Sequence, residues 1–145
     1  MKTLVKTFTA AALIAISTCT IAAVKPEKGI INLSTADYAI DNYIAVMTEG
    51  QSAGVEQLFA TDFSQKVQGI DTLLNHSRSE VIDLLKKQKG EKLNCETSIK
   101  IIEESAQYRV ARVTMKFTDF TKTDLITLIN EGGIWKVSSS VNSYQ

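Results

Sequence analysis

The last third of the chain, residues 93–144, constrains the fold more than any other part. It consists of four apolar-rich runs separated by turn signals near Glu104-Ser105, Asp119-Phe120 and Gly132-Gly133. This pattern predicts four successive long strands joined by tight turns. A sheet of this kind has to bury at least one of its faces, and the residues upstream have to supply the cover.

Counting back from the turns predicts which residues share a face, provided that no bulge shifts a strand by one position. The face predicted to lie against the helices carries Val113, Met115, Phe117, Ile126, Leu128, Trp135, Val137 and Val141. The opposite, outer face carries Cys95, Ile99, Ile101, Val110, Leu125 and Ile129, interrupted by Arg112, Thr127 and Ser138. Both faces are too apolar to lie in water. We therefore expect helices on the first face and a second copy of the chain on the outer face, in a sheet-to-sheet homodimer.

Three segments upstream of the sheet carry helix signals. Residues 34–50 have a hydroxyl cap at the start, apolar residues at helical spacing on one face, and a glycine at the end. A shorter helix is expected after Ser52. A third helix begins at Ser77, which forms a capping box with Glu80. Between the last two helices, residues 66–74 fit a short strand or hairpin.

The first 23 residues differ in character from the rest of the chain. Lys2 and Lys6 precede a stretch without charge, residues 8–23, that is rich in Ala, Ile and Thr. This order is typical of a secretory signal peptide, so we expect export to the periplasm or beyond the cell. Two alternatives remain open: an N-terminal anchor that is not cleaved, and a lipoprotein in which Cys19 is lipidated.

The remaining chain divides into a connector, residues 24–33, and one domain, residues 34–145. Without the signal segment it has 14 basic and 16 acidic residues, which does not favour a nucleic-acid partner. Cys95 is then the single remaining cysteine and His76 the only histidine, so neither an internal disulfide nor a transition-metal site is expected. We expect no cofactor and, after signal removal, no membrane span.

The order of the elements resembles the nuclear-transport-factor-2-like superfamily over residues 35–144. Its landmarks here are residues 43–50 (Tyr-Ile-Ala-Val-Met-Thr-Glu-Gly), Leu58-Phe59, and residues 133–137 (Gly-Ile-Trp-Lys-Val). Within the superfamily, the chain is most similar to small exported bacterial proteins labelled putative lumazine-binding. The resemblance implies a cone-shaped α+β fold, in which three N-terminal helices pack on a curved antiparallel sheet and enclose a pocket. It does not fix an activity, because the superfamily includes ketosteroid isomerase and many non-catalytic binders.

Two residues are candidate acid–base catalysts, since the resemblance implies a carboxylate or a His–Asp pair at the pocket of the superfamily's enzymes. The predicted register places Asp124 on the helix-covered face, opposite Met115 and Val141, where apolar neighbours would disfavour its charge and make it a base. The simpler interpretation is a solvated carboxylate near Lys122 at the rim of the sheet. His76 is expected in the loop before a helix, where the simpler interpretation is a surface histidine without a catalytic role.

The predicted ligand-binding residues combine aromatic, apolar and polar side chains. They are Tyr43, Phe59, Phe63, Met115, Asp124, Trp135 and Ser139. Such a mixture suits a small apolar or planar ligand, although the same side chains could simply fill the core. The sequence therefore favours an exported, non-catalytic ligand-binding protein. Two alternatives stay open: a pocket enzyme (isomerase, dehydratase or cyclase) with Asp124 as its base, and a homodimeric association module whose pocket is filled.

Overall fold

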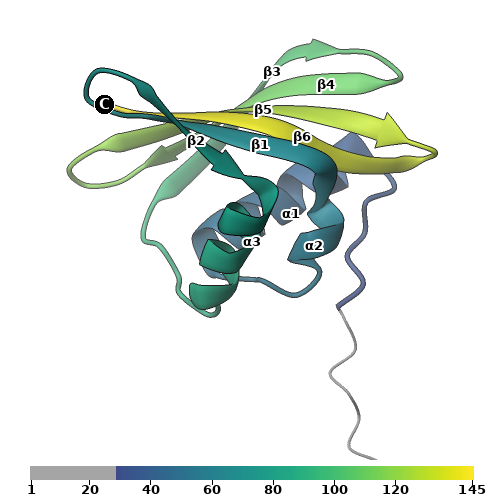
Figure 1. The fold of residues 1–145 in the computed structure, drawn as a ribbon, viewed down its shortest axis with the longest axis horizontal. Helices are drawn as coiled ribbons and strands as arrows, with labels where there is room; N and C mark the ends of the chain where they lie inside the picture. Colours follow the sequence, from purple (N-terminus) through teal and green to yellow (C-terminus); the bar gives the residue numbers. More distant parts are fainter. Residues whose placement is uncertain (1–28) are drawn as a thin grey trace, which may run out of the picture.

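The computed structural model describes residues 29–145. The predicted signal peptide and Cys19 therefore lie outside the described residues. The helices are α1 (Ala36–Glu49), α2 (Val55–Leu58) and α3 (Arg78–Lys87). The strands are β1 (Phe59–Gln68), β2 (Leu73–Ser77), β3 (Glu96–Glu104), β4 (Tyr108–Lys116), β5 (Thr121–Glu131) and β6 (Ile134–Tyr144). Together they form an α+β fold in which all three helices lie on one face of a curved six-stranded sheet (Figure 1).

Helix α1 follows the sequence signals closely. Thr35, and not Ser34, is its N-cap, and the Thr35 side chain accepts a hydrogen bond from the Tyr38 amide. Gly50 ends the helix in the left-handed region, with φ of 63°, where a residue without a Cβ has no steric penalty. One face of α1, which includes Ile40 and Tyr43, is fully covered by the rest of the molecule. The predicted start and end of this helix are therefore confirmed to within one residue.

The second and third helices are separated by a hairpin. Helix α2 is a single turn, because Phe59 already begins strand β1. Strands β1 and β2 pair antiparallel through Lys66 and Asn75, which confirms the hairpin expected at residues 66–74. At the start of α3, the Ser77 side chain and the carboxylate of Glu80 satisfy each other's backbone amides, so the predicted capping box is present.

The sheet has the strand order β2-β1-β6-β5-β4-β3 and is not entirely antiparallel. Strand β1 pairs with β6 in parallel, so the expectation of a purely antiparallel sheet is wrong at this position. The four strands predicted from residues 93–144 do form a continuous antiparallel series, with loops at the three predicted turns. The added hairpin places β6 in the interior of the sheet, between β5 and β1 (Figure 1).

The predicted faces are wrong for strand β3. Ile99 pairs with Val113 and Ile101 pairs with Ala111, so both isoleucines share the helix-covered face with those buried residues. Cys95 likewise packs against the core. The error arises from a bulge within β3: Ile101 pairs with Ala111, but the next partners are Glu103 and Val110, so Ile102 has no partner position. This shift by one residue exchanges the two faces from Ile101 back to the start of the strand.

A bulge in β6 causes a second exchange of faces. Leu128 pairs with Val137, but the next partners are Thr127 and Ser139, so Ser138 has no partner position. Beyond it, Ser139 and Val141 lie on the outer face, contrary to the prediction for both. Ser140 and Asn142 take their place on the helix-covered face and are buried there. The outer face thus differs in composition from the one expected, although Val110, Leu125 and Ile129 lie on it as predicted.

The core lies between the helices and the middle strands. Its largest fully buried apolar side chains are Tyr43, Phe59, Ile40, Leu58, Met115, Ile126 and Leu128. Trp135 is half-buried at the edge of this core, and its amide donates to the Leu33 carbonyl, which fastens the segment before α1 to β6. Among residues 29–145, no helix is long and apolar enough to cross a membrane.

Candidate functional site

A cleft of about 470 Å³ opens between α3 and the helix-covered face of the sheet. Its apolar wall consists of Met47, Val67, Val81, Leu84, Leu85, Leu93, Phe117, Phe120 and Tyr144. Its polar groups are Gln65, His76, Glu80, Gln88, Lys122 and Asn142. The volume lies within the range of about 300–1,000 Å³ that small-molecule sites occupy.

Two apolar parts of the cleft lining are more exposed to solvent than the side chains of a hydrophobic core. Leu84 on α3 is 52% exposed and lines the cleft. At the opposite wall, the rings of Phe117 and Phe120 stack with their centroids 4.5 Å apart and an angle of 15° between their planes. These surfaces are flat and solvent-accessible, which is the arrangement that an apolar or aromatic ligand can cover.

A buried chain of polar groups borders the cleft. The Tyr43 hydroxyl donates to Asp124 Oδ2 over 2.8 Å, and Lys122 Nζ donates to the same oxygen over 2.9 Å. Asp124 is completely buried, whereas the Lys122 side chain is 15% exposed and reaches the cleft. Burial, with the neighbouring charge of Asp124, raises the pKa of Tyr43 well above its usual value. Tyr43 is therefore a permanent hydrogen-bond donor at neutral pH.

The surroundings of Asp124 differ from those predicted. Its cross-strand neighbours are Val113 and Asn142, and not Met115 and Val141. The carboxylate is held by a tyrosine hydroxyl and an ammonium group, so it is not isolated among apolar side chains. Asp124 does not line the cleft itself; its neighbours Lys122 and Asn142 do.

Two buried oxygens at this end of the cleft have no hydrogen-bond partner, Asp124 Oδ1 and Asn142 Oδ1. Asn142 is 3% exposed and lines the cleft, so its amide is positioned to meet a bound molecule. A buried polar atom without a partner costs about 1–3 kcal/mol, which a ligand donor would offset. A second, more open hollow of about 800 Å³ between residues 30–34 and the β5–β6 turn contains none of the unpartnered buried atoms found in residues 29–145.

The structure places His76 on the wall of the cleft. It lies in strand β2 opposite Gln65, and not in a loop as predicted. Glu80 lines the same cleft, but its carboxylate accepts hydrogen bonds from the Ser77 hydroxyl and amide, and these bonds lower the pKa of Glu80. This carboxylate is thus engaged in the helix cap and is not hydrogen-bonded to His76.

Most of the predicted ligand-binding residues form the core beside the cleft. Tyr43, Phe59, Phe63 and Met115 are all buried, Trp135 packs at the edge of the core, and Ser139 lies on the outer face. Lys122 and Asn142 were missed. Lys122 could have been predicted from the sequence. Side chains two residues apart on a strand share a face, so Lys122 lies on the same face as Asp124. Asn142 could not have been predicted in the same way, because the bulge at Ser138 moves it to the helix-covered face.

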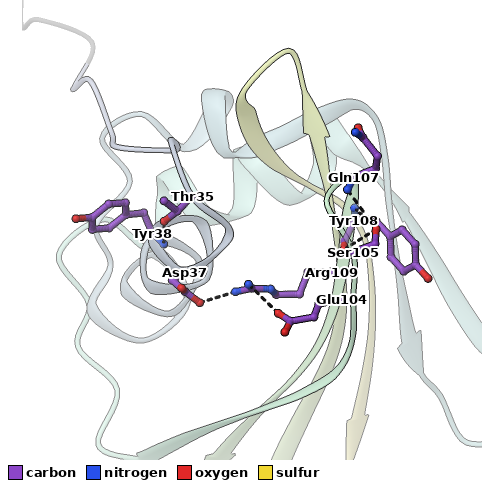
Figure 2. Close-up of polar contacts among 8 residues, drawn as sticks. All are labelled: Thr35, Asp37, Tyr38, Glu104, Ser105, Gln107, Tyr108 and Arg109. Atoms are coloured by element: carbon purple, nitrogen blue, oxygen red, sulfur yellow. Dashed lines mark hydrogen bonds and ion pairs between the residues drawn. The ribbon is translucent and has the colours of Figure 1, made fainter.

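A second charged cluster lies at the other end of α1. Figure 2 shows the Arg109 guanidinium between the carboxylates of Asp37 and Glu104. Arg109 comes from β4, Asp37 from the first turn of α1 and Glu104 from the end of β3, so the cluster ties the helix to the edge of the sheet. In the part of the chain that the structure describes, no group of three or more His, Cys, Asp or Glu side chains could hold a metal ion.

Comparison with solved structures shows the fold. An NTF2-like protein of unknown function from Silicibacter pomeroyi matches with a TM-score of 0.61 and 19% identity, over 75% of this chain and 90% of that one. An NTF2-like protein of unknown function from Shewanella baltica matches with a TM-score of 0.62 and 16% identity, over 74% and 88%. A ketosteroid isomerase-like protein from Erwinia carotovora atroseptica matches with a TM-score of 0.59 and 15% identity, over 77% and 95%.

A comparison with curated proteins gave no match. A family model, described as Putative lumazine-binding, matches residues 32–143 and so covers most of the chain. The match includes every helix and almost every strand residue described above, together with both sides of the cleft. The predicted resemblance is confirmed: the chain has an NTF2-like fold and belongs to the Putative lumazine-binding family.

Proposed function

We propose that this protein is an exported, non-catalytic protein that binds a small ligand in the cleft between α3 and the sheet. The observation that carries the proposal is the combination of an apolar wall with a buried, unpartnered amide oxygen on Asn142. Ligand sites are typically apolar with a few polar groups that fix the orientation of the ligand. The family's description agrees with this reading.

The cleft suits a flat ligand with polar edges. Leu84 and Leu85 on α3 line the same cleft as the stacked pair Phe117–Phe120, which favours an aromatic ring system as ligand. Asn142 offers an acceptor and a donor, and Lys122 offers a donor whose charge is already balanced by Asp124. An uncharged heteroaromatic molecule with N–H and C=O groups at its edge matches this set, and lumazine belongs to that class.

Export remains part of the proposal and rests on the sequence alone. The basic, uncharged and small-residue order of the first 23 residues supports it. So does the presence of only one cysteine, Cys95, beyond that segment, because the exported chain then has no thiol pair to oxidise. Determination of the N-terminal residue of the protein from its own host distinguishes cleavage near Ala23 from lipidation of Cys19 and from an uncleaved anchor.

The test of binding is native mass spectrometry of the protein purified from its own host, followed by titration with the recovered ligand or with lumazine. The unmodified protein is expected to carry one small molecule. Asn142→Ala, which removes the amide, is expected to weaken the affinity about tenfold, equivalent to the loss of one hydrogen bond. Asn75→Ala is the matched control, because Asn75 is exposed on the outer face. Equal affinity of both variants would place the ligand elsewhere.

An enzyme is the second candidate, favoured by the Tyr43–Asp124–Lys122 chain beside the cleft. In that case Lys122, and not Asp124, is the member of the chain that meets the substrate, because Lys122 lines the cleft. Incubation of the recovered ligand with excess protein separates the two functions. A ligand that returns with unchanged mass and structure supports binding, whereas conversion to an isomer or a dehydrated product supports the enzyme.

The homodimer through the outer face and the association module also remain predictions. The outer face carries Val110, Leu125 and Ile129, but Val141 joins them in place of the predicted Cys95, Ile99 and Ile101. The apolar area available for such an interface is therefore smaller than expected. An association module with a filled pocket predicts that no molecule binds the cleft, so the mass-spectrometry experiment tests it as well.

A further inference from the structure

Two buried polar side chains lie next to each other on the helix-covered face, at the inner end of the cleft. Asp124 on β5 and Asn142 on β6 occupy directly opposite positions in the β5–β6 register, and both are buried. Side chains in such positions have Cβ atoms about 4.5–5.5 Å apart, so two short polar side chains can reach each other. The contact between these two residues therefore affects what the cleft presents to a ligand.

Each of the two side chains has one oxygen without a hydrogen bond. Asp124 Oδ2 accepts from the Tyr43 hydroxyl and from Lys122 Nζ, whereas Asp124 Oδ1 has no partner within residues 29–145. Asn142 Oδ1 is likewise buried and without a partner in this part of the chain. Both oxygens are acceptors, so they cannot bond to each other. A buried acceptor that lacks a donor is costly, and here two of them lie side by side.

The opposite end of the Asn142 amide has access to solvent. Asn142 Nδ2 forms no hydrogen bond with any of the described residues, and it is not one of the buried atoms that lack a partner. Because Asn142 lines the cleft, the cleft is where this nitrogen meets solvent. The amide thus directs its donor into the cleft and its acceptor toward a second acceptor.

The neighbouring donors do not supply what Asp124 Oδ1 lacks. The single proton of the Tyr43 hydroxyl is donated to Oδ2, and Lys122 Nζ also bonds to Oδ2. Ser140 Oγ lies near Tyr43, but it is not in hydrogen-bond geometry with any side chain of residues 29–145. A half-turn of the Asn142 amide is the smallest change that brings a donor to Asp124 Oδ1.

We propose that Asn142 functions in this turned orientation, in which its NH2 group donates to Asp124 Oδ1 and its carbonyl oxygen faces the cleft. The two ends of an asparagine amide have nearly the same size, so a half-turn about the Cβ–Cγ bond exchanges them without a change in packing. This one rotation gives Asp124 Oδ1 a donor and gives Asn142 Oδ1 access to solvent or ligand. Asp124 is then a positioning residue that fixes the orientation of the Asn142 amide.

The orientation of the amide determines which ligands the cleft prefers, a consequence that rests on the binding function proposed above. A carbonyl oxygen accepts hydrogen bonds and cannot donate them, so the ligand has to place an N–H or O–H group against Asn142. A ligand that presents a carbonyl oxygen at this point leaves two acceptors facing each other and is disfavoured. The charge of Asp124 is already balanced by Lys122, so an uncharged donor, such as a ring N–H or an amino group, is the expected partner.

The orientation of the amide is tested by neutron diffraction from a crystal of the unmodified protein exchanged into D2O, because neutrons locate deuterium atoms. Two deuterium atoms are expected on the end of the Asn142 amide that faces Asp124 Oδ1. Deuterium on the end that faces the cleft would overturn the proposal, as would a water molecule that bridges the two oxygens. This experiment needs neither a ligand nor a variant, so its result is independent of the proposed binding function.

The ligand preference is tested by titration with lumazine, which has ring N–H groups, and with 1,3-dimethyllumazine, in which methyl groups replace those hydrogens. The unmodified protein is expected to bind the dimethyl compound about tenfold more weakly, because one hydrogen bond is lost. Asn142→Leu keeps a side chain of similar size without its carbonyl oxygen, so the ratio of the two affinities should fall toward one. Asn75→Ala, on the outer face, should keep the ratio.

The titrations separate failure of the preference from failure of the binding function. Equal affinities of the unmodified protein for the two compounds would confirm binding but overturn the preference. A ratio that persists in Asn142→Leu would assign the difference to the bulk of the methyl groups and would also overturn it. If lumazine does not bind the unmodified protein at all, the proposed ligand class fails and the preference fails with it. Near-ultraviolet circular dichroism checks that Asn142→Leu is folded, and Asn142→Ala replaces it if it is not.

Discussion

Two charged contacts hold α1 to the sheet, and they differ in their access to water. At the start of the helix, Asp37 meets Arg109, and the Asp37 side chain is 78% exposed (Figure 2). In the middle of the helix, Tyr43 meets Asp124, which is completely buried and also binds Lys122. Both contacts join residues that lie far apart in the sequence. The two contacts are therefore of the same kind, but one is exposed to solvent and the other is buried.

Burial determines how much the loss of each contact is expected to change the free energy of unfolding. An exposed ion pair is weakened by solvent and by the entropy of its side chains, and it contributes about 0–1 kcal/mol. A buried pair has little net effect on stability while it is intact, but the loss of one partner leaves the other charged and unsolvated. Disruption of the contact at Tyr43 and Asp124 is thus expected to destabilise the protein more than disruption of the contact at Asp37.

The largest expected effect follows from Asp124→Asn. This change leaves the Lys122 ammonium without a counter-charge, so we expect a loss of about 3 kcal/mol in the free energy of unfolding, measured by urea denaturation. The structure thereby corrects the simpler interpretation of Asp124 as a solvated carboxylate at the rim of the sheet, because the residue is fully buried. The double variant Asp124→Asn/Lys122→Met should regain part of the loss, because no charge is then stranded. Equal stability of Asp124→Asn and the unmodified protein would contradict the buried ion pair.

A smaller effect is expected at alkaline pH. Because the pKa of Tyr43 is raised in the folded state, ionisation of this residue favours the unfolded chain. Its contribution to stability is complete below pH of about 10, the usual tyrosine value, and falls above it by up to about 1.4 kcal/mol per pH unit. The measurement is the free energy of unfolding of the protein and of Tyr43→Phe from neutral to alkaline pH. The difference between the two curves gives the pH dependence that Tyr43 contributes. Parallel curves for the two proteins would show that Tyr43 does not carry it.

The smallest effect is expected for Asp37→Asn. It removes the exposed contact to Arg109 and a favourable charge in the first turn of α1, so the loss should stay below about 1 kcal/mol and decrease further in high salt. Asp41→Asn is the matched control, since Asp41 is exposed on the same helix and forms no ion pair within residues 29–145. A loss as large as that of Asp124→Asn would remove the distinction between the two sites.

Local signals predicted the helices and most of the strands. The capping box of Ser77 and Glu80 and the left-handed Gly50 depend only on residues close in sequence, and both are present. Gly132 and Gly133, with φ of 62° and 88°, form the β5–β6 turn as expected, because both positions need a conformation that glycine adopts without strain. Asp124 lies on the helix-covered face as the predicted register required, since the error in its β4 register was an even number of residues.

The site itself was predicted less well, for a definable reason. Side chains on a strand alternate between faces, so every odd shift in register moves a residue to the wrong side. The bulges at Ile102 and Ser138 both introduce odd shifts. Neither has a strong local signal, because a bulge is stabilised by the strands on either side of it. For that reason Ser139 was predicted to face the pocket, whereas Asn142 is the residue that lines the cleft.

The position of β6 in the sheet has a consequence for biosynthesis. This strand lies between β1 and β5, yet it is the last of the described strands to leave the ribosome. During translation β1 has no neighbour on that side, so the hydrogen bonds at the middle of the sheet form only after residues 134–144 have been made. Until then the chain is incompletely folded. Late closure of the sheet is compatible with the export proposed above, in which the chain would cross the membrane before it folds.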